Sequence, residues 1–204
     1  CREARSNIES LKSLGSRVKY FAADIRNGNL VDRIAEEIRS EWGDIRILIH
    51  GASVISDKYM HAKTAAQFEN VFATKVLGFR NLLMATRNDP LTHICCFSSV
   101  VARKGNEGQV DYAMANEVLN RVCQFESRRR NGRCLVKALN WGPWDAGMVT
   151  PQLKSYFEFK GYLLIPAGEG GRLFVREMEA EEDDQPVEVL LLRGDPEIWL
   201  KDRP

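Results

Sequence analysis

A serine, a tyrosine and an asparagine of this 204-residue chain are spaced so that they could act on one ligand. Ser99 ends an apolar run, a Gly-containing loop follows, and Tyr112 lies near the start of a helical segment. Tyr112 and Asn116 are four residues apart, so their side chains share one face of that helix. Because ligands of open α/β sheets bind at the carboxyl ends of strands, we predict that these side chains line an active-site cleft.

The side chains fit the reduction of a carbonyl group. Negative charge grows on a ketone oxygen as hydride arrives, and preorganised donors must stabilise it. Tyr112 would supply the proton, and Ser99 would hydrogen-bond the same oxygen. A phenol has an ordinary pKa of about 10, which a nearby ammonium such as Lys75 would lower. Each residue alone has a plainer interpretation, as a loop cap, a surface charge or a packed aromatic, so the hypothesis rests on their joint spacing.

Short apolar runs alternate with helical segments, a pattern typical of an α/β fold with a parallel sheet. The segments dense in Val, Ile, Leu, Phe or Cys predict strands at residues 17–22, 45–50, 93–98, 133–140 and 187–192. Longer segments of helical period predict helices at residues 30–42, 65–86 and 112–130. The acidic run at residues 177–184 is interpreted as a solvated helix end and turn. One domain is expected.

Composition narrows the class of protein further. With 29 Lys+Arg against 28 Asp+Glu, the charge favours neither nucleic acid nor an anionic membrane as partner. We expect no membrane span, no secretory signal and no metal site, because the three histidines are scattered. The five cysteines are odd in number, and their spacing fits no disulfide framework, which indicates reduced thiols and a cytoplasmic protein. Cys95 and Cys96 are interpreted as buried hydrophobes.

The spacing resembles a known family. Short-chain dehydrogenases place a Ser about thirteen residues before a Tyr, as Ser99 and Tyr112 are placed here. Most of them carry a Lys four residues after the Tyr, whereas this chain has Asn116 there and Lys75 upstream. That exchange is similar to the ketoreductase domains of polyketide and polyunsaturated fatty-acid synthases. The resemblance implies a Rossmann-type, doubly wound parallel sheet.

The resemblance also implies an NADPH site. Leu48 to Val54 and Asn140 to Trp144 resemble the strand ends beside the cofactor, and Asp24 falls where the family binds the adenine amino group. Lys75 would also hold the nicotinamide ribose, and Asn116 would position Lys75 or a relay water. Trp141 and Trp144 could equally be packing residues. The implied cofactor-binding residues are Asp24, Ile25, His50, Gly51, Ala52, Lys75, Tyr112, Gly142 and Pro143.

The implied activity is reduction of a 3-ketoacyl thioester to the 3-hydroxyacyl thioester. The implied partners are an acyl carrier protein, which presents the substrate on phosphopantetheine, and neighbouring synthase domains. Lys104-Gly105, where one subclass carries a Trp, and Asp57 lean toward the D-configured product. Residues 152–166 are interpreted either as a lid over the substrate or as ordinary packing.

The family opens with a strand and a Gly-rich turn that binds the cofactor pyrophosphate. This chain instead starts with residues 1–14, which look like the helix after the family's second strand. We therefore expect a piece of a longer polypeptide, with a hole between the strands at residues 17–22 and 45–50, that does not fold natively alone.

Two other functions stay open at this point. One is a free-standing short-chain dehydrogenase that acts on a small ketone or alcohol. The other is a non-catalytic half-domain that braces a megasynthase, against which the presence of Lys75, Ser99, Tyr112 and Asn116 argues.

Overall fold

The computed structural model describes residues 2–147, 149–180 and 185–201. Helices and parallel strands alternate along most of this part of the chain, which confirms the predicted α/β class. The elements are α1 (Arg2–Ser13), α2 (Gly28–Trp42), β1 (Ile47–His50), η1 (Met60–Ala62), α3 (Ala65–Phe72), η2 (Ala73–Leu77), α4 (Gly78–Ala85), β2 (His93–Ser99), α5 (Val101–Lys104), α6 (Val110–Arg130), β3 (Leu135–Trp141), α7 (Pro151–Phe159), α8 (Ala167–Met178), β4 (Glu188–Leu191) and α9 (Pro196–Lys201).

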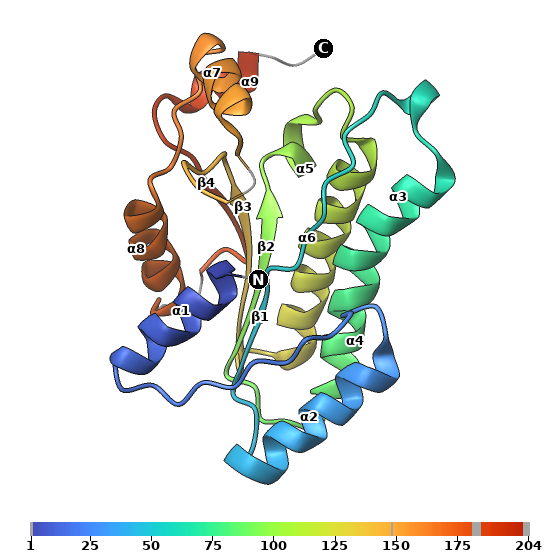
Figure 1. The fold of residues 1–204 in the computed structure, drawn as a ribbon, viewed down its shortest axis with the longest axis vertical. Helices are drawn as coiled ribbons and strands as arrows, with labels where there is room; N and C mark the ends of the chain where they lie inside the picture. Colours follow the sequence, from blue (N-terminus) through green and yellow to red (C-terminus); the bar gives the residue numbers. More distant parts are fainter. Residues whose placement is uncertain (1, 148, 181–184, 202–204) are drawn as a thin grey trace.

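The sheet has the order β1-β2-β3-β4, and every neighbouring pair in it is parallel. Helices α4 and α6 cover one side of the sheet and α8 covers the other, while α5, α7 and α9 gather at the end toward which the β2 arrow points (Figure 1). His50 is level with Cys96, and Ser99 with Trp141, so the carboxyl ends of β1, β2 and β3 meet at this end.

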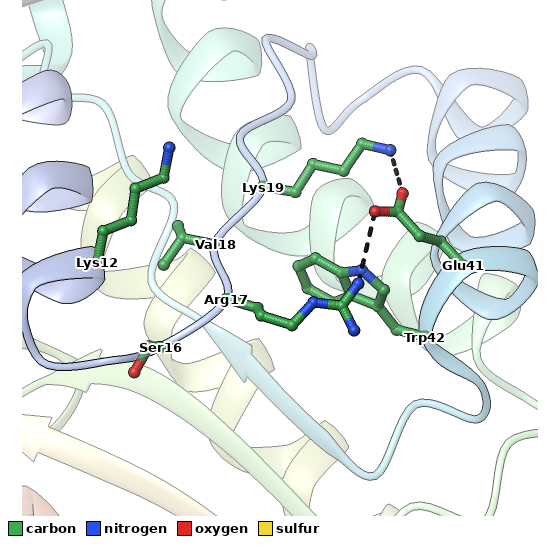
Figure 2. Close-up of a pocket in the computed structure, with 7 residues that line it drawn as sticks. All are labelled: Lys12, Ser16, Arg17, Val18, Lys19, Glu41 and Trp42. Carbon is green, nitrogen blue, oxygen red and sulfur yellow. Dashed lines mark hydrogen bonds and ion pairs between the residues drawn. The ribbon is translucent and has the colours of Figure 1, made fainter.

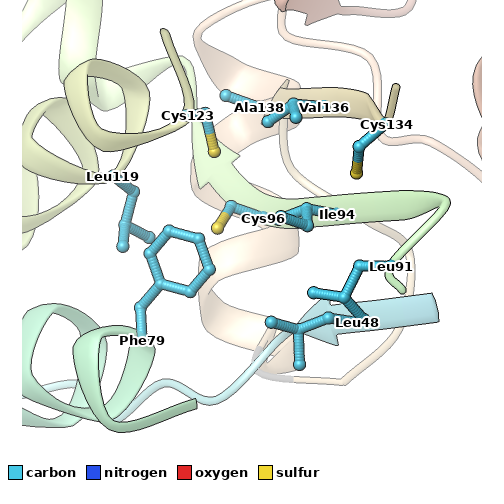
Figure 3. Packing of buried hydrophobic residues seen from close by; sticks show 10 residues of the cluster. All are labelled: Leu48, Phe79, Leu91, Ile94, Cys96, Leu119, Cys123, Cys134, Val136 and Ala138. Carbon is cyan, nitrogen blue, oxygen red and sulfur yellow. The ribbon is translucent and has the colours of Figure 1, made fainter. Parts of the chain in front are cut away.

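The main core lies between the sheet and helices α4 and α6. Side chains from β1, β2, β3 and both helices interlock there, with Phe79 and Leu119 facing Cys96 (Figure 3). Cys95, Cys96, Cys123 and Cys134 are free thiols and all are buried, which confirms the interpretation of Cys95 and Cys96 as small hydrophobes. Cys1 lies outside the described residues.

The strand predicted at residues 17–22 is wrong, because these residues form no regular element. A strand needs a neighbour to satisfy its backbone groups, and the described sheet ends at β1. The hole was expected between two strands, but only one of the two forms, so the described sheet ends at β1 instead. Strand β1 is therefore the edge of the described sheet. Its Ile47 and Ile49 side chains are 52% and 47% exposed, whereas Leu48 and His50 are buried in the core.

The acidic run is only partly solvated. Glu177 in α8 is buried and forms an ion pair at 3.4 Å with Lys137 of β3, which is itself fully buried. The prediction of a solvated helix end is wrong at Glu177, because the acid compensates a cation inside the fold. Residues 181–184 lie outside the described part.

Asp89 joins the end of α2 to the start of the sheet. Its buried carboxylate accepts hydrogen bonds from Arg39 Nε at 3.2 Å and from the Ile45 amide at 3.0 Å. We expect Asp89→Ala to lower the free energy of unfolding by about 2 kcal/mol, because two donors lose their acceptor. Urea denaturation followed by circular dichroism measures it. Asp145→Ala, which removes a half-exposed ion pair with Lys154, is the matched control and should cost much less. Equal losses in the two variants would contradict this account.

Candidate active site

Strand β2 and helix α6 place Ser99 and Tyr112 as the sequence predicts. Ser99 is the last residue of β2, is 7% exposed, and accepts a hydrogen bond from the Val101 amide at 3.3 Å. The short helix α5 and a loop then lead to α6, whose first turn contains Tyr112. The phenol of Tyr112 is close enough to Ser99, Asn116 and Ser53 for their polar side chains to affect its pKa.

Lys75 lies in a π-helical turn between α3 and α4. The turn spans Ala73–Leu77, and the Gly78 amide at its end donates to the Ala73 carbonyl five residues back. The predicted helix over residues 65–86 is thus correct in extent, but it is interrupted at the Lys75 position. Such turns add one residue to the helix and often mark functional sites.

His50 at the end of β1 supports this turn. Its Nε2 lies 2.9 Å from the Lys75 carbonyl oxygen, and its ring stacks on Phe79 at 5.4 Å between centroids. Burial and then the Lys75 cation lower the pKa of His50 to about 4, so the imidazole is neutral at physiological pH. A neutral ring with a protonated Nε2 donates to that carbonyl.

The Lys75 ammonium is 2% exposed and donates to the Phe97 carbonyl oxygen at 3.1 Å. It also lies 5.2 Å from the centroid of the Tyr112 ring. Burial lowers the pKa of Lys75 to about 8, which still leaves most of the group charged at neutral pH. The structure therefore brings together the cation and the phenol that the sequence predicts as partners.

Burial raises the pKa of Tyr112, and the polar groups of Asn116, Ser99 and Ser53 act in the opposite direction. The phenol is accordingly a protonated donor at neutral pH. Sequence reasoning missed Ser53, although it lies in the motif after β1. Its Oγ is buried and has no hydrogen-bond partner within the described chain.

Asn116 is fully buried on the next turn of α6. Its Nδ2 donates to the Tyr112 carbonyl oxygen at 2.8 Å, while its Oδ1 has no partner among the described residues. Ser98 ties this turn to the sheet, because its Oγ is 3.2 Å from the Asn116 carbonyl oxygen and 3.1 Å from Oδ1 of Asn140. An unsatisfied buried amide oxygen is unusual in a folded protein and indicates an absent partner such as a water or a ligand.

The residues assigned to cofactor binding lie on several elements. Gly51 and Ala52 follow β1, and no atom lies within 4 Å of a Cβ built on Gly51. Gly142 and Pro143 follow β3, and a Cβ on Gly142 would lie only 3.0 Å from Leu192, so that turn requires a small residue.

Asp24 and Ile25 lie on the loop before α2. Asn81 of α4 anchors this loop by donating to the Ile25 and Arg26 carbonyl oxygens, each at 3.0 Å. Asp24 is half-exposed and pairs with Arg26, which lowers its pKa to about 2. The structure assigns no ligand to these residues, so their binding role stays a prediction.

Two segments near the site had open interpretations, namely the tryptophans after β3 and residues 152–166. Trp141 is 5% exposed and packs edge-on against Trp144 at 4.7 Å, which supports the packing role for both. Within residues 152–166 the structure supports packing for one side chain, and the lid over the substrate stays a prediction. Tyr162 packs into a cluster with Trp199, whereas Phe159 on α7 is 86% exposed.

A separate pocket lies between the ends of α1 and α2 (Figure 2). Its lining residues are Lys12, Ser16, Arg17, Val18, Lys19, Glu41 and Trp42. None of them belongs to the predicted site, and Lys19 and Arg17 are both paired with Glu41.

In the described chain, no group of three or more His, Cys, Asp or Glu is placed to hold a metal. No helix there is long and apolar enough to cross a bilayer.

Comparison with solved structures defines the fold. A ketoreductase domain from the bacillaene assembly line superposes with a TM-score of 0.87 at 25% identity, over 98% of this chain and 49% of that one. An N-terminal ketoreductase from the macrolactin assembly line gives 0.84 at 28% identity, over 98% and 39%. A short-chain dehydrogenase from Burkholderia cenocepacia, solved with NADP, gives 0.84 at 16% identity, over 95% and 83%. The sheet is therefore the Rossmann-type sheet of the short-chain dehydrogenases.

Sequence comparison defines the family. A profile described as the KR domain matches residues 1–146, and the chain belongs to this ketoreductase family. It is 38% identical over 171 residues to a polyunsaturated fatty acid synthase of Thraustochytrium sp., a match that covers 83% of this chain. It is 33% identical over 150 residues to polyketide synthase PksL of Bacillus subtilis, covering 71%. These matches span 6% and 3% of the two synthases.

The buried cation at Lys75 should reduce the stability of the fold. The unfolded chain holds the lysine proton up to pH 10.5, but the folded chain releases it near pH 8. We expect Lys75→Met to raise the free energy of unfolding by about 2 kcal/mol at pH 7, because the burial cost outweighs one lost hydrogen bond.

Between pH 8 and 10.5 the unfolded chain binds more protons, so the stability of the parent should rise with pH and approach that of the variant. Chemical denaturation of both proteins at pH 7 and pH 10 tests this. If Lys75→Met had a lower free energy of unfolding than the parent, by the same amount at both pH values, a costly buried Lys75 cation would be contradicted.

Proposed function

We propose that this chain reduces a 3-ketoacyl thioester, carried on an acyl carrier protein, to the 3-hydroxyacyl thioester with NADPH. The observation that supports the proposal most is the placement of the Lys75 ammonium against the Tyr112 ring at the carboxyl end of β2. Membership of the KR-domain family, whose relatives include fatty-acid and polyketide synthases, agrees with this chemistry.

Tyr112 and Ser99 have the roles that a developing alkoxide requires. When bound, the reduced nicotinamide supplies the hydride that adds to the ketone carbon. Ser99 Oγ orients the ketone oxygen, and the Tyr112 phenol transfers its proton to that oxygen, which gives the alcohol. Lys75 stabilises the phenolate left behind, because its charge lies beside the ring in a site screened from water.

Residues of this chain fit the nicotinamide end of the cofactor. The Asn116 Oδ1 and Ser53 Oγ are buried without partners in the described chain, and the backbone at Gly51 is open. We assign Gly51, Ala52, Gly142 and Pro143 to the backbone surface against the cofactor, because small or compact residues allow a close approach. Lys75 would hold the ribose, and Asn116 would bind a water that relays the proton.

The proposal of a carrier-bound substrate rests on the large synthases to which this chain is similar. Both are named as synthases, and the chain matches only a few per cent of their length. We therefore propose an acyl carrier protein with phosphopantetheine-bound substrate as partner, together with neighbouring synthase domains. The D-configured product stays a prediction that rests on Asp57 and Lys104-Gly105.

We expect Tyr112→Phe, made in the natural polypeptide that contains this chain, to lower kcat for NADPH oxidation at least about a hundredfold with a 3-ketoacyl thioester, since the proton donor is lost. NADPH fluorescence titration should show unchanged cofactor binding. Absorbance at the reduced nicotinamide band follows turnover.

Tyr20→Phe is the matched control, because Tyr20 is 63% exposed on the loop after α1 and should leave kcat unchanged. Undiminished turnover in Tyr112→Phe would exclude the mechanism. A parent that reduces small free ketones but no carrier-bound substrate would favour the free-standing dehydrogenase. A parent that binds NADPH but reduces neither would favour the bracing role.

A further inference from the structure

The segment between β1 and α3 is fastened to the start of α6 by contacts that the proposed mechanism does not use. This segment, residues 53–64, leaves the carboxyl end of β1 with the buried Ser53 and returns at the N-cap of α3. It therefore borders the same end of the sheet as Ser99 and Tyr112. Two separate sets of bonds join it to residues 108–112.

The first set is a buried ion pair. Lys63 Nζ lies 2.6 Å from Oδ2 of Asp111, and the two side chains are only 3% and 1% exposed. The same ammonium donates to the Ser56 carbonyl oxygen at 2.7 Å. Lys63 thus holds its own segment in a fixed shape while it reaches α6. Removing one partner of such a pair would leave the other charged and buried, at a high cost.

Asp111 also binds the backbone of Tyr112, the proposed proton donor. Its second carboxylate oxygen, Oδ1, accepts a hydrogen bond from the Tyr112 amide at 2.9 Å. One carboxylate therefore binds the backbone of Tyr112 with one oxygen and Lys63 with the other. An acid in the first turn of α6 is also favourably placed in the field of the helix dipole.

The second set lies nearer the surface. Gln109 Nε2 donates to Oδ2 of Asp57 at 2.7 Å, and the Lys58 amide donates to the Gly108 carbonyl oxygen at 2.9 Å. Gly108 has a φ of +76°, and a Cβ there would lie 3.5 Å from the Lys58 backbone, so a glycine suits this junction.

We propose that Lys63 and Asp111 are positioning residues for Tyr112, and that their ion pair sets the phenol relative to the segment that contains Ser53. The inference rests on the proposed reductase function. A catalytic proton donor must be held close to the productive geometry, and a displacement of about 1 Å can cost up to a hundredfold in rate. The tie fixes Tyr112 through its backbone from the side opposite Asn116, which binds the Tyr112 carbonyl.

The test compares two double variants in the natural polypeptide that contains this chain. Lys63→Met with Asp111→Asn removes the ion pair without leaving a buried charge unpaired. Lys137→Met with Glu177→Gln does the same to the buried pair between β3 and α8, and it is the matched control. We expect the first variant to lower kcat about tenfold with an unchanged KM for NADPH, and the control to leave kcat unchanged at a similar loss of thermal stability.

Gln109→Leu provides a variant that should fold in any case, because it severs only the partly exposed second contact. Its kcat should fall about threefold, again without a change in the KM for NADPH. The positioning role is wrong if Gln109→Leu keeps the parental kcat and so does every double variant that folds. It is also wrong if the Lys137 and Glu177 double variant loses as much kcat as the Lys63 and Asp111 double variant.

The outcomes also separate the two proposals. A parent protein that does not reduce the thioester overturns the proposed function and the positioning role together. A parent that reduces it and loses that activity in Tyr112→Phe, but keeps it in the Lys63, Asp111 and Gln109 variants, overturns the positioning role alone.

Discussion

The site depends on one ammonium group held inside the fold. Lys75 is almost fully buried, and its Nζ is bound by the Phe97 carbonyl oxygen, while no carboxylate in the described chain forms an ion pair with it. A cation in such surroundings is costly, and its field is weakly screened. The ring centroid of Tyr112 lies 5.2 Å from this ammonium. The fold therefore gives up stability at the point where the proposed chemistry needs a positive charge.

Three features hold the Lys75 ammonium and the Tyr112 ring near each other, and each has a physical cause. The π-turn at Ala73–Leu77 contains Lys75, and neutral His50 at the end of β1 donates to the Lys75 carbonyl oxygen. The parallel register places His50 beside Cys96, the residue before Phe97, and the carbonyl of Phe97 lies within reach of Nζ. Helix α6 then fixes Tyr112 from both sides through Asp111 and Asn116.

Local sequence spacing was sufficient to predict where Ser99, Tyr112 and Asn116 lie on their elements. Tyr112 and Asn116 share a helix face because they are four residues apart, and the apolar run before Ser99 forms the strand β2 between β1 and β3. The extent of α6 and the burial of Cys95 and Cys96 follow from the same short-range patterns.

What depends on distant neighbours could not be predicted in this way. Residues 17–22 have the composition of a strand but no strand in the described chain beside them to pair with, so they form none. Glu177 looked solvated because its partner Lys137 lies 40 residues earlier. The bond between Lys63 and Asp111 likewise joins residues 48 positions apart, and nothing in the local pattern of either indicates it.

The central claim is that Lys75 and Tyr112 of this chain support hydride addition to a ketone and deliver the proton to its oxygen. The most direct test uses the natural polypeptide with NADPH deuterated at the transferred position of C4 and a carrier-bound 3-ketoacyl thioester, with the product analysed by mass spectrometry. We expect one deuterium on C3 of the 3-hydroxyacyl product, and no such product from Tyr112→Phe. Product formation without deuterium at C3, or an equal yield from Tyr112→Phe, would contradict the claim.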